Sequence, residues 1–391
     1  MIRASTRRWL VALLALTAAP VRAQGLFLPS APSAMFDTSI RAAAMGGAGA
    51  AVTWGEPGVW ANPATLAGVR GVGWVTGRTR PFPGDYFFGE MVFSSQRLLL
   101  GGGGVGVSLM GQPISGLGKA QFDYGSGVLP GARASAIGGR FGPPVDKTKG
   151  WGVGVSPLRL IESIGKLARW PARSLTTYGD VTLGYQSEAS KFTAGSFSDE
   201  EGVTYDWGVS GRLALARWWG ADAPFRLDLS GAWSKLNTLQ SGSQHGAPSA
   251  TQINRTGVAL HLSPAPPSER SASPPSLPWW RPGEVPEFSV GLAYDHDQMH
   301  DVAFGPQASS IDHYGFEANV FRLLALRVGY LTAPFADVEG WSYGGGVTLP
   351  VGPWGSVGYQ FASVPTMDDF DRPLRQGWTV WLDPTRFFVK G

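Results

Sequence analysis

The fold of this chain is decided by two runs, VTYDWGVSGRLAL at residues 203–215 and FRLDLSGAWS at residues 225–234. Apolar residues occupy every second position of each run, and polar or small residues fill the positions between them. Because successive side chains of a β-strand point to opposite faces, each run has one apolar and one polar face. Both runs exceed the ~5–6 residues typical of soluble strands and fit the ~9–11 that a tilted strand needs to cross a bilayer.

The polar faces of the two runs carry charges among small residues. These charged residues are Asp206, Arg212, Arg226 and Asp228. A register slip of one residue would turn them toward lipid, where an arginine near the midplane costs roughly 2–4 kcal/mol, so the pattern fixes the inward face. We therefore predict that the four charges form a network in the lumen of a membrane barrel, where they stabilise the interior or contact a substrate. A secreted soluble β-domain also alternates and is the alternative.

The composition agrees with a membrane barrel. The chain has 391 residues, enough for one large barrel or two ordinary domains, with 55 Gly, 16 Trp and only 16% charged residues. Many glycines, aromatic girdles and few charges are typical of such barrels. The absence of Cys excludes disulfides, thiolate metal sites and a lipidated cysteine anchor.

Residues 1–23 have the features of a secretory signal peptide. Arg3, Arg7 and Arg8 precede an apolar run, and Val21-Arg22-Ala23 offers a small-x-small cleavage site. An uncleaved anchor is the alternative, although the apolar run is too short to span a bilayer as a helix. No later segment approaches ~20 apolar residues, so we expect no transmembrane helix.

The net charge gives no argument for nucleic-acid binding. Without the four arginines of residues 1–23, the 32 Lys and Arg fall to 28, against 29 Asp and Glu.

Residues 24–70 differ from everything that follows. The stretch from Ile40 to Val52 is small and apolar and has no strand alternation. Small residues permit close packing between inward side chains, so we expect this segment to fold into the lumen as a plug. Asn62-Pro63 favours an extended or turn geometry at Asn62. An ordinary glycine-rich leader to the first strand is the alternative.

The same segment contains an Arg, then Met-Gly-Gly-Ala, then Asn-Pro-Ala-x-Leu, just after the expected signal peptide. This arrangement resembles the N-terminal signature of the long-chain fatty acid transporter (FadL-like) superfamily, which includes the PorV/PorQ-type proteins associated with type IX secretion. The residues that carry the resemblance are Arg41, Met45, Gly46, Gly47, Ala48, Asn62, Pro63, Ala64 and Leu66. The resemblance implies an outer-membrane barrel of about 14 strands with an N-terminal plug or hatch in its lumen.

From residue 71 to residue 391 we expect the barrel itself. The alternating runs number roughly 14 to 15, and we choose 14 because single-chain bacterial barrels prefer even numbers. The predicted fold class is all-β: a transmembrane, antiparallel up-and-down β-barrel of about 14 strands with an N-terminal lumen plug. The stretch from Gln112 to Arg140 is unclear, with a weak strand near Arg133 to Phe141.

Two long loops are expected, near residues 157–177 and 263–286. Helical spacing in the first predicts a short amphipathic helix that lies against the membrane interface, caps the barrel mouth or packs on its own barrel. Its apolar residues are Leu158, Ile161, Ile164, Leu167 and Ala168, and its polar residues are Arg159, Glu162 and Lys166. The second loop is rich in Pro and Ser, cannot pair in a sheet, and is expected to be mobile and extracellular.

The C-terminal run from Arg375 to Leu382 resembles the signal read by the barrel-assembly machinery. The pattern polar-x-Gly-x-x-apolar-x-apolar is carried by Arg375, Gly377, Val380 and Leu382. Nine further residues follow, and Phe387-Phe388 is an alternative end for the last strand.

Chemical motifs are weak. Gly101-x-Gly103-x-x-Gly106 matches a dinucleotide fingerprint but lacks the helix that must follow it. His296 and His300, with the neighbouring aspartates, could supply ligands to a divalent metal, but we expect a solvated loop there. No motif singles out a nucleophile, so we predict neither an enzyme nor a cofactor.

We therefore expect an outer-membrane barrel of a Gram-negative cell that binds or passes hydrophobic cargo, gated by its plug. The expected partners are outer-membrane lipid, the barrel-assembly machinery and a hydrophobic small molecule or a secreted protein. The first alternative is a PorV-like component of a secretion or surface-attachment machine. The second is a structural or adhesive surface barrel.

Overall fold

A computed structural model describes residues 39–56, 58–79, 91–110, 120–124, 145–167, 175–193, 199–216, 224–240, 252–264, 288–300, 308–320, 323–333, 338–351, 355–365 and 374–382. The expected signal peptide, the weak strand near 133–141 and Phe387-Phe388 lie outside these residues. Within the described ranges, no helix is long and apolar enough to cross a membrane.

The described chain is mostly strand. The strands are β1 (Gly71–Thr79), β2 (Met91–Gly102), β3 (Val105–Met110), β4 (Ala120–Tyr124), β5 (Val145–Val155), β6 (Gly179–Thr193), β7 (Asp199–Ala214), β8 (Phe225–Gln240), β9 (Gln252–Pro264), β10 (Phe288–His300), β11 (Ala308–Val320), β12 (Leu324–Ala333), β13 (Val338–Val351), β14 (Gly355–Ser363) and β15 (Leu374–Leu382). The helices are α2 (Ile40–Ala44), the 3₁₀ helix η2 (Pro63–Gly68) and α4 (Pro157–Leu167).

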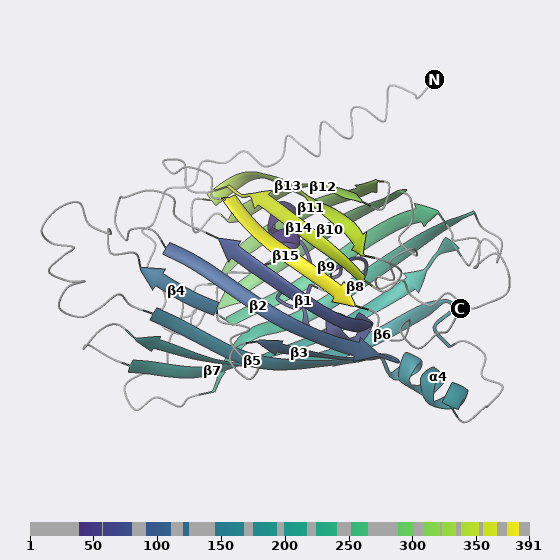
Figure 1. Cartoon of the computed structure of the whole chain (residues 1–391), viewed down its shortest axis with the longest axis horizontal. Coiled ribbons are helices and arrows are strands. Elements are labelled where there is room, and N and C mark those ends of the chain that lie inside the picture. Colours follow the sequence, from purple (N-terminus) through teal and green to yellow (C-terminus); the bar gives the residue numbers. More distant parts are fainter. Residues whose placement is uncertain are drawn as a thin grey trace, which may run out of the picture.

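The strands form one antiparallel sheet that closes on itself (Figure 1). Closure is made by β1, which pairs with β2 on one side and with β15 on the other. β3 and β4 share one position between β2 and β5, because Arg97 of β2 faces Met110 of β3 and Ser94 faces Gln121 of β4. The 15 strands therefore fill 14 barrel positions, which confirms the predicted up-and-down barrel and explains the ambiguous strand count.

The two faces of the wall differ as the alternation predicts. Along β7 and β8, the apolar series that contains Trp207 and Leu229 is exposed, whereas Asp206, Arg212 and Asp228 are buried on the inward face. Exposed apolar side chains cover the outside of most strands and include Val181, Leu183, Val209, Leu213, Phe225, Val258, Leu262, Phe288, Leu292, Leu324, Leu326, Leu349 and Val351. A wall with this polarity suits lipid outside and a polar interior.

Aromatic rings mark one border of the outer apolar belt. They stand in neighbouring pairs with centroid distances of 4.5 Å for Tyr185 and Trp207, 5.1 Å for Tyr294 and Tyr314, 5.2 Å for Tyr330 and Trp341, and 4.9 Å for Tyr359 and Trp378. Further along the same outward faces the residues are polar, namely Lys235, Asn254, Gln298 and Glu339. Aromatic girdles of this kind stand at membrane–water interfaces.

The barrel has two distinct ends. β1 begins at Gly71 and β15 ends at Leu382 at the same end, which we call the termini end; the other is the opposite end. The order of the strands places α4, the end of β9 and the start of β10 at the termini end. The loop expected near residues 263–286 lies, apart from its first two residues, outside the described residues.

Candidate functional site

Residues 39–70, which we call the inner segment, lie inside the barrel. α2 packs against β12 to β15, whereas η2 packs against β2, β3 and β5 to β7, across the lumen. The side chain of Ser39 caps α2 by accepting from the Ala42 N–H at 3.1 Å. Asn62 caps η2 by accepting from the Ala64 N–H at 2.9 Å, and Pro63 takes the first helical position, where its missing N–H is not needed. The Asn-Pro-Ala sequence is therefore a helix start.

The inner segment contacts the backbone of the barrel directly. Nine strands present a glycine where a Cβ would come closer than 3.0 Å to an atom of the inner segment: Gly101, Gly106, Gly154, Gly184, Gly208, Gly291, Gly315, Gly329 and Gly344. We call this set the glycine belt. The motif residues meet it: Asn62 lies against Gly208, Met45 against Gly315 and Leu66 against Gly106. These glycines let the wall approach the inner segment more closely than a side chain would allow.

Glu317 of β11 is the strongest polar anchor of the inner segment. Its carboxylate accepts two hydrogen bonds from Arg41, at 2.8 Å from both Nε and Nη2, and one from Trp54 Nε1 at 2.9 Å. Arg327 of β12 donates from Nε at 2.6 Å. The side chain of Glu317 is 2% exposed. A buried carboxylate holding two arginines joins the inner segment to the wall.

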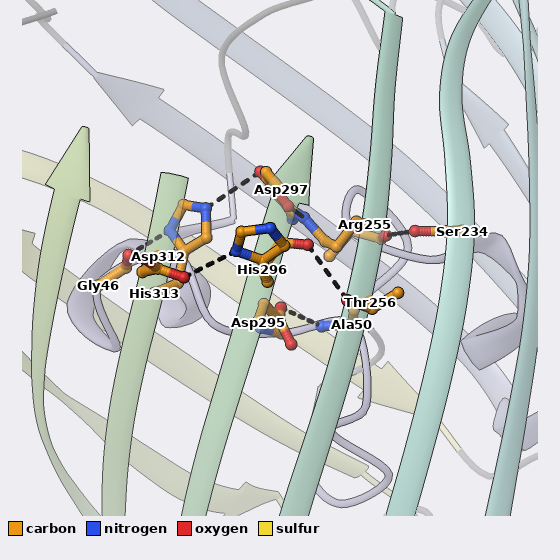
Figure 2. Close-up of polar contacts among 12 residues, drawn as sticks. Gly46, Ala50, Ser234, Arg255, Thr256, Asp295, His296, Asp297, Asp312 and His313 are labelled. Carbon is orange, nitrogen blue, oxygen red and sulfur yellow. Dashed lines mark hydrogen bonds and ion pairs between the residues drawn. The ribbon is translucent and has the colours of Figure 1, made fainter. Parts of the chain in front are cut away.

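Asp295 of β10 holds the next part of the inner segment through backbone groups. Its Oδ2 accepts from the N–H groups of Gly49 and Ala50 at 2.7 and 2.8 Å, as Figure 2 shows for Ala50. The side chain of Asp295 is fully buried. Two adjacent backbone donors that converge on one carboxylate form an anion-binding nest.

His313 of β11 forms a third anchor beside Asp295 (Figure 2). Its Nδ1 lies 2.7 Å from the carbonyl oxygen of Gly46 and its Nε2 lies 3.0 Å from Oδ2 of Asp297. Both ring nitrogens of His313 therefore face an oxygen that can accept a hydrogen bond. Arg255 of β9 donates to both oxygens of Asp297 at 2.6 Å.

The run from Asp295 to His300 is not the solvated loop that we expected. β10 continues through it, so Asp295 and Asp297 point inward while His296 points outward and lies 2.8 Å from Oδ1 of Asp312. The alternation of the strand separates the two kinds of candidate metal ligand. The side chain of His300 lies outside the described residues, and the described part of the chain holds no group of three potential metal ligands.

The four charges predicted to form one network are divided between two places. Arg212 donates from Nη1 to Asp228 at 3.0 Å. Asp206 instead accepts from Gln186 at 2.9 Å and from the backbone N–H of Asn237 at 2.7 Å. The Asp206–Asn237 bond sits where the β7–β8 register shifts. Arg226 lies on the same face, half-buried.

A second buried polar cluster was not foreseen. Arg97 of β2 donates to Ser108, Gln186 and Glu188, the last at 2.8 Å, and its guanidinium carbon lies 3.6 Å from the centre of a Trp60 ring. The inner segment is therefore held by a cation–π contact on the side facing away from Glu317. The sequence signal for this cluster is an arginine at an inward-facing position of an otherwise apolar strand.

An apolar layer lines the lumen beyond the inner segment. Leu236, Ile253 and Met299 are buried together with half-buried Ile311 packed on them. The layer lies two positions closer to the opposite end than the polar anchors of the same strands. Ile253 is paired in this way with Arg255, Met299 with Asp297 and Ile311 with His313. The sequence signal that we missed is an apolar residue at an inward-facing position in each of four successive strands.

A cavity of about 90 Å³ lies on the other side of the inner segment, at the termini end. Its lining combines Trp54, Trp381 and Leu324 with the ion-paired side chains of Arg41 and Glu317.

The remaining predicted residues are placed as follows. Arg375, Gly377, Val380 and Leu382 belong to β15, the strand that closes the barrel against β1. Gly101, Gly103 and Gly106 lie at the end of β2, in the β2–β3 turn and in β3, with no helix following.

Comparison with known proteins gives structural likeness only. No protein-family model matches the sequence, and no curated protein matches it. The toluene transporter TbuX of Ralstonia pickettii aligns with 88% of this chain and 97% of its own at 11% identity and a TM-score of 0.46. A FadL homologue of Pseudomonas aeruginosa aligns with 88% and 98% at 9% identity and a TM-score of 0.42. The toluene transporter TodX of Pseudomonas putida aligns with 87% and 96% at 10% identity and a TM-score of 0.40.

Proposed function

We propose that this protein is an outer-membrane channel for small hydrophobic molecules, and that the inner segment is its plug. The termini end faces the periplasm and the opposite end faces the outside. Residues 1–23 direct export, and Arg375, Gly377, Val380 and Leu382 of β15 engage the barrel-assembly machinery. The resemblance of residues 41–66 to the N-terminal signature of the FadL-like superfamily supports this proposal.

The membrane location is supported by the outer surface. Exposed leucines, valines and tryptophans form a belt that would be costly in water, and the aromatic pairs border it on the opposite-end side. Within the described strands the buried charges lie on the inward face, as they must in a wall surrounded by lipid.

The cargo class is supported by the position of the apolar layer, which is the observation that carries the proposal. A molecule entering from the opposite end reaches Leu236, Ile253 and Met299 before the polar anchors of the plug. A luminal patch of four apolar side chains selects a small apolar molecule by desolvation rather than by hydrogen bonding.

The plug role is supported by the way the inner segment is held, which is through hydrogen bonds and ion pairs to the barrel wall. The inner segment fills the lumen at the level of the glycine belt and is held by anchors such as Glu317 and Asp295. These bonds can exchange with water without breaking the barrel, so the plug can shift while the wall stays closed.

The cargo assignment is tested by uptake of radiolabelled toluene into Gram-negative cells that express the protein and have no other hydrocarbon channel. The double variant Ile253→Asn, Met299→Asn should lower the uptake rate toward that of cells without the protein. The matched control, Gln298→Asn, changes an outward neighbour and should leave uptake unchanged. Wild-type uptake by the double variant would reject the apolar layer as the cargo path.

The PorV-like alternative keeps the same barrel and plug but predicts another phenotype. Deletion of the gene would then reduce surface display of secreted proteins and leave toluene uptake unaffected.

A further inference from the structure

The helix α4 begins directly where β5 ends. Ser156 caps it: its Oγ accepts from the N–H of Arg159 at 3.2 Å, and its carbonyl accepts from the N–H of Leu160 at 2.9 Å. Pro157 occupies the first helical position, where proline is favoured. Figure 1 shows α4 projecting beyond the strands at one end of the barrel.

The polar side of α4 faces the barrel. Arg159 pairs with Asp180 at the start of β6, and Ser163 donates to the carbonyl of Gly103 in the β2–β3 turn at 3.2 Å. Glu162 accepts from the N–H of Thr176 at 2.7 Å. Glu162 and Ser163 follow Arg159 by three and four positions, so the three residues share one face of the helix.

The apolar side of α4 faces away from the barrel. Ile161 and Ile164 are 52% and 50% exposed, although they are large and branched. A helix packed on its own protein turns its apolar stripe inward and its charges outward. α4 does the reverse, which contradicts packing of its apolar face on the barrel and indicates an apolar medium outside the protein.

The surroundings of α4 identify this medium. The chain that leads from α4 into β6 exposes Leu175 and Tyr178, and β6 continues with the exposed outward residues Val181 and Leu183. These last two belong to the outward apolar belt of the barrel, so exposed apolar side chains lie on α4 and again from Leu175 onward. An exposed tyrosine beside this surface is typical of the interfacial zone.

We propose that α4 is an interfacial helix, with Ile161 and Ile164 inserted at the boundary between head groups and acyl chains of the leaflet at the termini end. This inference rests on the proposed location of the barrel in a membrane. Amphipathic helices bind in this way through their buried apolar face, while the polar face stays at the water side. Here the polar face is fastened to the rim of the barrel by Arg159, Glu162 and Ser163.

The test uses the full chain, which has no natural Cys, with one introduced cysteine at a time. Ile164→Cys and Lys166→Cys are spin-labelled and reconstituted in vesicles of phosphatidylethanolamine and phosphatidylglycerol. Lys166 is the matched control because it lies on the polar face of the same helix. Leu229→Cys reports on the belt of the barrel.

The proposal predicts that the label at position 164 is relaxed by oxygen and protected from a water-soluble nickel chelate. The label at position 166 should show the reverse, with a several-fold difference in the ratio of the two accessibilities. Nickel access at 164 equal to that at 166 would overturn the proposal, as would shielding of 164 from both reagents, which would mean a protein partner or a second copy. A label at 229 in lipid with a label at 164 in water would reject the interfacial helix alone, whereas both in water would also reject the membrane barrel.

Discussion

Arg41 and Glu317 are 276 positions apart in the chain and form a two-point ion pair inside the barrel, with both N–O distances at 2.8 Å. Arg41 belongs to the inner segment and Glu317 to the wall, and the side chains are 5% and 2% exposed. The pair therefore reports whether the inner segment is docked.

The first prediction concerns loss of this pair. Glu317→Gln leaves two buried arginines without their counter-charge, and breaking a buried pair in this way costs about 3–5 kcal/mol. We expect the inner segment to leave its site and the peptide bond after Arg41 to become sensitive to trypsin, as read by mass spectrometry. Glu339→Gln is the control, because within the described residues Glu339 bonds only to half-buried Tyr330, at the surface of the barrel. Equal resistance of Glu317→Gln and the native protein would contradict the anchor.

The second prediction concerns the glycine belt. Gly329→Ala would place a Cβ closer than 3.0 Å to the backbone of Met45 and Gly46. Overpacking of this kind costs typically ~1–3 kcal/mol, so the variant should open the trypsin site after Arg41 in part. Gly211→Ala is the matched control, since nothing lies within 4 Å of its added Cβ, and its stability should change by less than about 0.5 kcal/mol. Indistinguishable digestion of the two variants would refute close packing of the two backbones.

The third prediction concerns the extent of the lipid-facing belt. Leu229→Arg places a charge in the belt and should lower the yield of folded barrel, because arginine facing the bilayer centre costs roughly 2–4 kcal/mol. Gln298→Arg lies beyond the aromatic border and should fold normally. The folded fraction is measured by migration of unboiled and boiled samples on a denaturing gel. Normal folding of Leu229→Arg would place the belt elsewhere.

Local alternation was sufficient to predict the wall. The period of two is a property of each strand alone, so the faces of residues 203–234 could be assigned without knowing their neighbours. The helical spacing near residue 160 likewise predicted α4, and the small residues around Gly46 predicted a segment suited to a crowded lumen.

Long-range contacts could not be predicted in the same way. The pairing of Arg41 with Glu317 depends on the register and closure of the whole sheet, which no local pattern encodes. The run from Asp295 to His300 was misjudged because its polar residues suggested a loop. In the structure, Asp297 pairs with Arg255 and His313, and Oδ2 of Asp295 accepts from the inner segment. The amphipathic pattern of α4 left three placements open: against the membrane interface, over the barrel mouth or packed on its own barrel. Only the contacts of α4 show which of its faces meets the barrel.

The central claim is that residues 39–70 close a membrane barrel, and single-channel conductance in planar bilayers tests it most directly. The intact chain should conduct poorly, because the inner segment fills the lumen. A variant lacking residues 40–66 that keeps its heat-modifiable migration should form stable pores of much higher conductance. A folded deletion variant that conducts no better than the intact chain would contradict the account.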